Sequence, residues 1–141
     1  MNKTFLKIFS KANVLVYRLT NGRVWGGLKS SPVCLVTMKG RKTGKTRTIP
    51  LMYVPYGDQV VLVASLAGAP EHPVWYHNLM AYPHVTIQAG SAKQDMDVRQ
   101  ASPEEKAEIW PHAVAAYGDF ADYQERTDRD IPVLICTPAG G

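Results

Sequence analysis

The sequence predicts a mainly β, α+β domain built around an antiparallel meander or barrel. Short segments rich in β-branched residues recur at the spacing of such a sheet, and Gly-containing turns separate several of them. Consecutive strands lie too close in the chain for the crossovers that parallel strands need. Two segments with helix-start signals interrupt the strands. The length of 141 residues fits one domain with a substantial core.

Six strands are expected along the chain. Tyr56–Gln59 and Gly90–Ala92 are expected turns, because glycine supplies the positive φ that tight hairpins require. Cys34 and Cys136 lie in apolar strand segments without metal-ligand spacing, which favours buried free thiols over a disulfide or a metal site. The strands are placed at Val33–Met38, Arg47–Pro55, Val60–Ala64, His84–Ala89, Lys93–Gln100 and Ile131–Thr137.

Helices are expected on either side of the fourth and fifth strands. Pro73–Ala81 begins with a proline suited to a helix start, and Pro83 prevents its continuation. A second helix begins at Ser102, where Glu105 completes a capping box, and runs through Trp110. After it, three aromatic residues recur every third position and would form one face of a helix, either core or the lid of a pocket. They are Tyr117, Phe120 and Tyr123.

Residues 1–21 are predicted to form a basic amphipathic helix, and residues 22–141 the barrel domain. Apolar side chains between residues 3 and 19 fall on one helical face and basic ones on the other. Either the apolar face caps the domain, or the helix rests on anionic lipid headgroups. Neither a bilayer-spanning run nor a secretory signal is recognised, so we expect a cytoplasmic protein, with peripheral contact at the inner face of the plasma membrane as the alternative.

Charged side chains are unevenly distributed along the chain. Residues 1–57 carry 11 Lys and Arg and no Asp or Glu, whereas residues 58–141 carry 5 Lys and Arg and all 12 acids. The formal charge is therefore +11 in the first part and −7 in the second, for a net +4. Such a division bears on partners more than on fold. We expect a phosphate, a polyanionic tail or an anionic surface to meet the first part.

The segment from Gly40 to Arg47 has the composition of an anion-binding loop. It places four Lys and Arg, two Thr and two Gly between expected strands. Residues 44–46 imitate a Walker A motif, but Lys39 stands where that motif has its first Gly, and a strand follows in place of a helix. Nucleotide hydrolysis is therefore not expected, whereas the glycine N–H groups and the cations suit a phosphate. The alternative is a solvated basic hairpin loop.

The stretches Ala64–Pro70 and Pro73–Leu79 favour a site for a planar ring. Small residues at a strand end give a flat floor, while Trp75 and Tyr76 give a stacking wall, and Asn78 adds hydrogen-bonding groups. Trp75 taken alone is more typical of a core.

A metal site and a hydrolytic triad are not supported. His72 and His77 are five residues apart, which differs from the four-residue offset of helical zinc motifs, and no Cys or carboxylate completes a set. Ser65 lies in no nucleophile-elbow pattern.

Several short motifs in a fixed order carry a family resemblance. They are Gly40-Arg41-Lys42-Thr43-Gly44, Ile49-Pro50-Leu51, Ala64-Ser65, Pro73-x-Trp75-Tyr76-x-Asn78-Leu79, Trp110-Pro111, Tyr123-Gln124 and Arg129-x-Ile131-Pro132. Together they resemble the deazaflavin-dependent nitroreductase family of actinobacteria, also described as F420H2-dependent quinone reductases. The resemblance covers residues 25–138, and its ordered set is far more specific than the basic loop alone.

The resemblance implies an antiparallel split β-barrel of the flavin-binding type, with an N-terminal helix and two or three further helices. It also implies coenzyme F420, a deazaflavin with a phosphate-linked oligoglutamate tail. Matching positions would hold the phosphate and tail, line the barrel side, or surround the ring and its linker. These three sets are Arg41, Lys42, Thr43, Lys45 and Arg47; Thr48, Ile49, Pro50 and Met52; and Val63, Ala64, Ser65, Leu66, Trp75, Tyr76 and Asn78.

The implied reaction passes a hydride from the reduced deazaflavin to a quinone, an activated enone or enoate, or a nitroaromatic. The catalytic candidates are Ser65, as a hydrogen-bond donor, and Tyr117 and Tyr123, which would shape the acceptor site or relay a proton. Met52 and Phe120 would complete that site. Relatives tend to have an aromatic residue at the first of these and Tyr at the second, so the loss of a phenol is expected to redirect substrate choice.

Two other functions remain as alternatives. One keeps the barrel but binds flavin mononucleotide, whose phosphate also suits the loop but uses less of its positive charge. The other is a basic domain that binds an anionic surface without catalysis. Nucleic acid is not expected, because the aromatic residues are not interleaved with the basic ones. The sequence leaves the oligomeric state open.

Overall fold

The computed structural model describes residues 27–28 and 31–139. The predicted helix at residues 1–21 lies outside them. Eight strands are formed within the described residues. They are β1 (Gly27–Leu28), β2 (Ser31–Lys39), β3 (Thr46–Met52), β4 (Val54–Tyr56), β5 (Gln59–Val63), β6 (His84–Ala89), β7 (Ala92–Gln100) and β8 (Val133–Pro138). A 3-10 turn η1 (Leu66–Gly68) and helices α2 (Val74–Ala81), α3 (Pro103–Ala116) and α4 (Asp119–Arg126) complete the chain.

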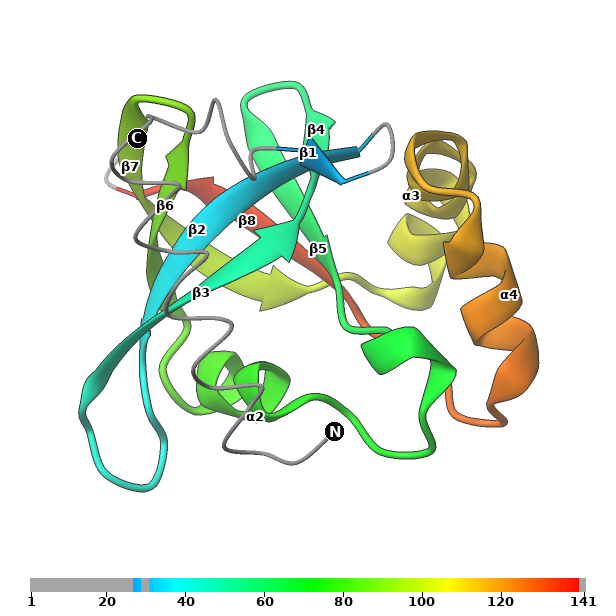
Figure 1. Ribbon diagram of the computed structural model, residues 1–141, viewed down its shortest axis with the longest axis horizontal. Helices are drawn as coiled ribbons and strands as arrows, with labels where there is room; N and C mark the ends of the chain where they lie inside the picture. Colours follow the sequence, from blue (N-terminus) through cyan, green and yellow to red (C-terminus); the bar gives the residue numbers. More distant parts are fainter. Residues whose placement is uncertain (1–26, 29–30, 140–141) are drawn as a thin grey trace.

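The sheet is antiparallel and curls around a core, as Figure 1 shows. Its strand order is β1-β2-β6-β7-β8-β5-β4. The strand β3 lies outside this order and pairs with β2 along the edge opposite β6. The segment expected as one strand at Arg47–Pro55 is two strands, and that expectation was wrong: β3 pairs with β2 and β4 with β5. Because these partners belong to opposite ends of the order, the segment joins the ends of the curled sheet, as in a split barrel. The chain order is also not a simple meander, since β5 pairs with β8.

Two cores share the strands β5 and β8. Alternate side chains of a strand face opposite sides of a sheet, and here both sides are covered. The barrel core contains Leu62, Leu134 and Cys136 with Cys34, Val36, Met38, Leu79, Val85, Ile87, Met96 and Val98. The helix-side core contains Val61, Val63, Val133 and Ile135 with Val54, Ile109, Ala113, Tyr117, Phe120 and Ile131. The second core attaches α3 and α4 to the outside of the barrel.

Local signals placed the helix starts correctly. Ser102 Oγ accepts from the Glu105 N–H at 3.2 Å, and the Glu105 carboxylate accepts from the Ser102 N–H at 3.0 Å, which confirms the capping box. The helix α3 continues past Pro111 to Ala116, and α4 begins only at Asp119. Tyr117 therefore precedes α4, and the three aromatic residues do not share one helix.

Both cysteines are buried free thiols, as predicted. Burial raises the pKa of Cys34 well above its usual value and that of Cys136 to about 12, so both thiols stay protonated and inert. Among the described helices, none combines the length and hydropathy needed to cross a bilayer.

Candidate functional site

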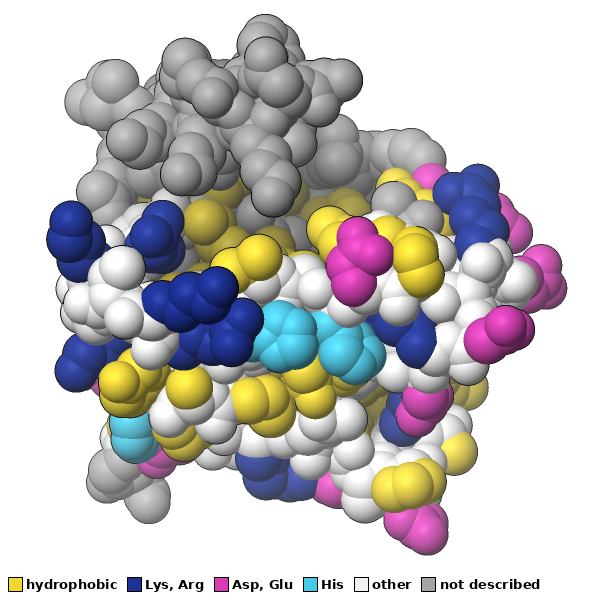
Figure 2. All heavy atoms as spheres, turned by 90° about the horizontal axis from the view of Figure 1, so that it is seen from below, with side chains coloured by type: hydrophobic (Ala, Val, Ile, Leu, Met, Phe, Trp, Pro, Cys, Tyr) yellow, Lys and Arg dark blue, Asp and Glu magenta, His cyan; other side chains and the backbone are white. Residues whose placement is uncertain are grey.

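One face of the molecule brings together most of the predicted site. In Figure 1 the β2–β3 hairpin, α2 and the segment that contains η1 follow one another along the lower edge of the molecule, and α4 lies on the right side beside η1. Figure 2, which looks at this edge from below, shows Lys and Arg gathered on the hairpin side and histidines in the middle. Most Asp and Glu on this face lie on the opposite side. On this face, the charged side chains of the described residues are thus also divided in space.

The basic loop is a tight, ordered turn. Its ends are joined by the Gly40 N–H to Lys45 C=O bond of 2.9 Å, and the Gly44 N–H donates to the Gly40 C=O at 2.8 Å. Gly44 has a φ of 71°, a conformation that other residues adopt at a cost. The loop therefore presents its side chains from a fixed backbone.

A hollow of about 280 Å³ lies between this loop and α2. In the described residues no ion pair occupies the cations of the loop, and all four are exposed. Three cationic side chains and one hydroxyl side chain line the hollow. None of its lining residues carries a carboxylate. An anion would neutralise these cations and accept from directional donors. The lining residues are Gly40, Arg41, Lys42, Thr43, Arg47, Val74 and Asn78.

Asn78 fixes the loop to α2. Its side chain is buried, and its Oδ1 accepts from the Arg41 backbone N–H at 3.0 Å. Its Nδ2 donates weakly to the Met38 sulfur at 3.7 Å. The predicted role of Asn78 was a contact with the ring or its linker; in this structure it lines the hollow beside the basic loop.

We expect Asn78→Ala to lower the free energy of unfolding by about 1–2 kcal/mol, because the buried Arg41–Asn78 bond is lost. Affinity for an anion in the hollow should fall with it, since the loop is no longer fixed. Chemical denaturation and ligand titration measure the two effects. Met80→Ala, at an exposed position of the same helix, is the control and should change neither. An unchanged stability of Asn78→Ala would contradict this role.

The segment Ala64–Pro70, called here the Ser65 loop, lies between β5 and α2 and contains η1. Ser65 is 8% exposed, and Leu66 is exposed with a φ of 44°, which is strained for a residue other than glycine. Ala64 is fully buried: its N–H donates to the Pro132 carbonyl at 2.9 Å, and its carbonyl accepts from Arg129 at 3.2 Å. Ala64 is therefore not accessible in this structure, and the floor expected at this loop stays a prediction.

Arg129 is a functional candidate that the sequence analysis missed. Its guanidinium donates to the carbonyls of Ser65 at 2.6 Å, Ala69 at 2.8 Å and Ala64 at 3.2 Å. It also contacts His72 Nδ1 at 2.9 Å. Arg129 belongs to one of the family-like motifs, but nothing in the local sequence indicates which distant carbonyls it would meet.

Two tyrosines form a hydroxyl pair beside the Ser65 loop. Tyr117 and Tyr123 are joined through their hydroxyls at 3.2 Å, and the backbone of Tyr123 lies against Gly68. The hydrogen bond with Tyr123, together with burial and Asp119, raises the pKa of Tyr117 well above 10. Phe120 is 3% exposed and packs edge-on against both tyrosines. Phe120 is thus part of the core behind the pair, and its place at the acceptor site stays a prediction.

The remaining predicted residues are spread around the hollow and the loop. Trp75 and Tyr76 are half-buried against the barrel core, and the Tyr76 hydroxyl donates to Gln100 at 2.8 Å. The Thr48 hydroxyl is hydrogen-bonded to that of Thr37 at 2.9 Å. The others do not line the hollow: Lys45 is exposed; Ile49, Pro50 and Met52 are half-buried on β3; and Val63 is buried.

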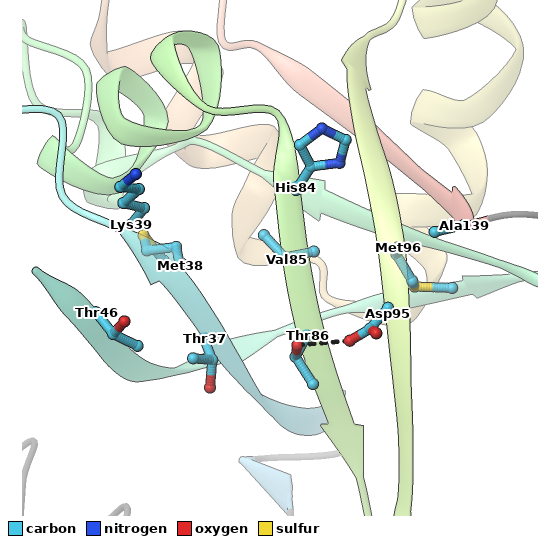
Figure 3. Close-up of a pocket in the computed structure, with 10 residues that line it drawn as sticks. All are labelled: Thr37, Met38, Lys39, Thr46, His84, Val85, Thr86, Asp95, Met96 and Ala139. Atoms are coloured by element: carbon cyan, nitrogen blue, oxygen red, sulfur yellow. Dashed lines mark hydrogen bonds between the residues drawn. The ribbon is translucent and has the colours of Figure 1, made fainter. Parts of the chain in front are cut away.

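A second hollow, of about 410 Å³, lies on the sheet and is shown in Figure 3. Several of its polar groups already have partners: Thr86 donates to Asp95 at 2.7 Å, and His84 contacts Asp97, which does not line the hollow, at 2.5 Å. None of the predicted site residues lines it. The functional site is therefore assigned to the face of the hairpin, α2 and the Ser65 loop.

Comparison with known proteins gives a consistent result. The family described as F420H(2)-dependent quinone reductase matches residues 9–138. A Mycobacterium tuberculosis protein that carries this family name is 41% identical over 113 residues, which cover 80% of this chain and 95% of the relative.

Solved structures agree with the sequence relatives. The structure titled as an F420-H2 dependent reductase has 43% identity and a TM-score of 0.70, and the match covers 74% of this chain and 93% of the other. Another structure, titled as a domain-swapped dimer, has 38% identity and a TM-score of 0.72, with 89% and 95% covered. The Vibrio cholerae heme storage protein HutZ, at 12% identity and a TM-score of 0.58 over 80% of this chain and 84% of its own, shares the split-barrel fold alone. The chain belongs to the F420H(2)-dependent quinone reductase family, and it is an oxidoreductase whose cofactor is coenzyme F420.

Proposed function

We propose that the hollow under the β2–β3 loop binds the phosphate and acidic tail of F420. The deazaflavin ring of the cofactor then extends over α2 toward the Ser65 loop. The observation that carries this proposal is the group of cations around the hollow, which have no carboxylate partner in the described residues. The donors present fit a multiply anionic group, since Arg41 and Arg47 can form paired hydrogen bonds and Lys42 adds a point charge.

When bound in its reduced form, F420 supplies a hydride to an electron-poor acceptor. The chain then has to orient the acceptor and supply a proton. Ser65 follows β5 by two residues and is 8% exposed, and we propose that its hydroxyl donates to the acceptor or to the cofactor. No nucleophile on the protein is required.

The pair Tyr117–Tyr123 is proposed to border the acceptor and to pass on the balancing proton. The raised pKa of Tyr117 keeps its phenol protonated, so it can donate a hydrogen bond, but it also makes the phenol a weaker acid, which favours Tyr123 as the group that passes on the proton. Tyr123 is half-buried and adjoins the Ser65 loop, so it is the member of the pair that can reach both solvent and the site. Met52, half-buried on β3, offers an apolar contact to the acceptor in the place of an aromatic ring.

We propose a quinone as the acceptor, because relatives carry that name, with activated enones or enoates and nitroaromatics as further substrates. The test is an anaerobic titration with reduced and oxidised F420, followed by assays of cofactor oxidation with menadione, an enone and a nitroaromatic. We expect binding of both cofactor forms and the fastest turnover with menadione. Retention of a yellow flavin during purification, without F420 binding, would favour flavin mononucleotide instead.

A further inference from the structure

We propose that Arg129 and His72 form a clamp that holds the Ser65 loop in the shape used at the cofactor site, and that protonation of His72 opens this clamp. This inference rests on the proposed function, which places the loop against the cofactor ring. Arg129 and His72 act through the loop and are positioning residues.

The loop needs an external constraint, because it is strained. Leu66 holds a positive φ of 44°, a conformation that is unfavourable for a residue with a side chain. Inside the loop, the backbone forms only short bonds, from Gly68 N–H to Ser65 C=O at 2.9 Å and from Ala69 N–H to Leu66 C=O at 3.0 Å. Two such bonds fix one turn without attaching it to the barrel, and the Ala64 N–H, which donates to the Pro132 carbonyl at 2.9 Å, attaches only the first residue of the loop.

Arg129 supplies that attachment from a segment more than 55 residues away in sequence. Its guanidinium spans the loop, with bonds to Ala64 and Ser65 at one end and to Ala69 at the other. Carbonyls at the end of a strand need donors, and a planar group with five N–H donors can serve several of them at once. A lysine in this position has a single charged nitrogen and cannot span the loop.

His72 completes the clamp only when it is neutral. Its Nδ1 lies 2.9 Å from Arg129 Nη1, and because guanidinium nitrogens only donate, Nδ1 must accept. Protonation places an N–H on this nitrogen and a second positive charge against Arg129. The surrounding groups are Tyr76, whose ring centroid is 4.6 Å away, His77 at 6.0 Å, and Glu71, whose charge acts on Arg129.

The direction of the pH effect follows from the same contacts. Burial, then Arg129 and His77, lower the pKa of His72 below 6.5 in the folded protein. The contribution of the clamp to stability is therefore complete above pH 6.5 and is lost as the pH falls through the lowered pKa of His72. Burial lowers the pKa of Arg129 and the charge of Glu71 opposes this shift; because a guanidinium starts from a pKa far above this range, Arg129 stays cationic throughout.

Amide hydrogen exchange of the full chain without cofactor tests the clamp directly. The probes are the amides of Gly68 and Ala69, with rates corrected for intrinsic exchange between about pH 5 and 8. We expect the wild type to lose protection below pH 6.5. His72→Asn, whose amide oxygen accepts without titrating, should remove this pH step. His77→Asn is the matched control and should keep it.

Arg129→Lys should increase exchange at both amides at least about tenfold at neutral pH, because at least one charge-assisted bond is lost. The same variant should also lower affinity for F420. The clamp would be overturned by wild-type protection that does not change with pH, or by a pH step that persists in His72→Asn. Because this test uses the His72 variant, it remains decisive even if Arg129→Lys does not fold. If exchange behaves as expected but affinity is unchanged, the positioning role is overturned. Absence of F420 binding in the wild type would instead overturn the proposed function.

Discussion

Reversing the charge of Lys42 and Arg47 together is expected to lower the affinity for F420 by at least about 100-fold. Both side chains are exposed and line the hollow. A hydrogen bond to a charged group contributes about 1.5–3 kcal/mol, so losing two costs about 3–6 kcal/mol before repulsion is added. Each 1.4 kcal/mol is about a tenfold change in affinity. Fluorescence titration of oxidised F420 measures the change.

The folded state should tolerate this double change, because exposed substitutions usually alter the free energy of unfolding by about 0.5 kcal/mol or less. Lys42→Glu can be compared with Lys93→Glu, which makes the same change of charge at an exposed position on β7, outside the hollow. Only the first should weaken binding by a large factor, and wild-type affinity should fall as salt is added. Equal affinities of the Lys42→Glu, Lys93→Glu and wild-type proteins would show that the tail binds elsewhere.

Local signals in the sequence predicted much of the fold. The capping box at Ser102 and the glycine turns depend on neighbouring residues, and the structure confirms both. The single strand at Arg47–Pro55 was wrong because periodicity does not report which partner a strand pairs with. A change of partner at Tyr53 closes the barrel, and only the tertiary structure contains that information.

The candidate site also has parts that the local sequence predicts and parts that only the tertiary structure reveals. The basic loop was predictable, since four cations and two glycines occur within eight consecutive residues. The bond from the Arg41 N–H to Asn78 was not, because it joins residues 37 positions apart. Arg129 shows this most clearly: its partners are 57 to 65 residues away, and its segment reads as an ordinary loop. Phe120 was placed at the acceptor by resemblance, whereas packing against Tyr117 and Tyr123 buries it.

Replacing Gly68 by alanine is expected to destabilise the protein by about 2–4 kcal/mol. Gly68 has a φ of 79°, and an added Cβ would lie 2.7 Å from the Tyr123 carbonyl oxygen and 3.0 Å from the Arg126 Cβ. The left-handed conformation costs about 1–2 kcal/mol, and the shift of packed groups costs about 1–2 kcal/mol more. For a chain of this size the melting temperature should fall by roughly 5–15 °C. Thermal and denaturant unfolding measure both quantities.

Gly57 separates the two causes of this loss. Its φ of 65° is similar, but an added Cβ would meet nothing within 4 Å, so Gly57→Ala should cost only the conformational part, about 1–2 kcal/mol. The difference between the two variants measures how closely η1 packs against α4. Because that contact joins the Ser65 loop to Tyr123, Gly68→Ala should also lower kcat for quinone reduction, whereas Gly57→Ala should not. Equal losses of stability in the two variants would mean that α4 yields to the added methyl, and that the Ser65 loop and the tyrosine pair are not held together by this contact.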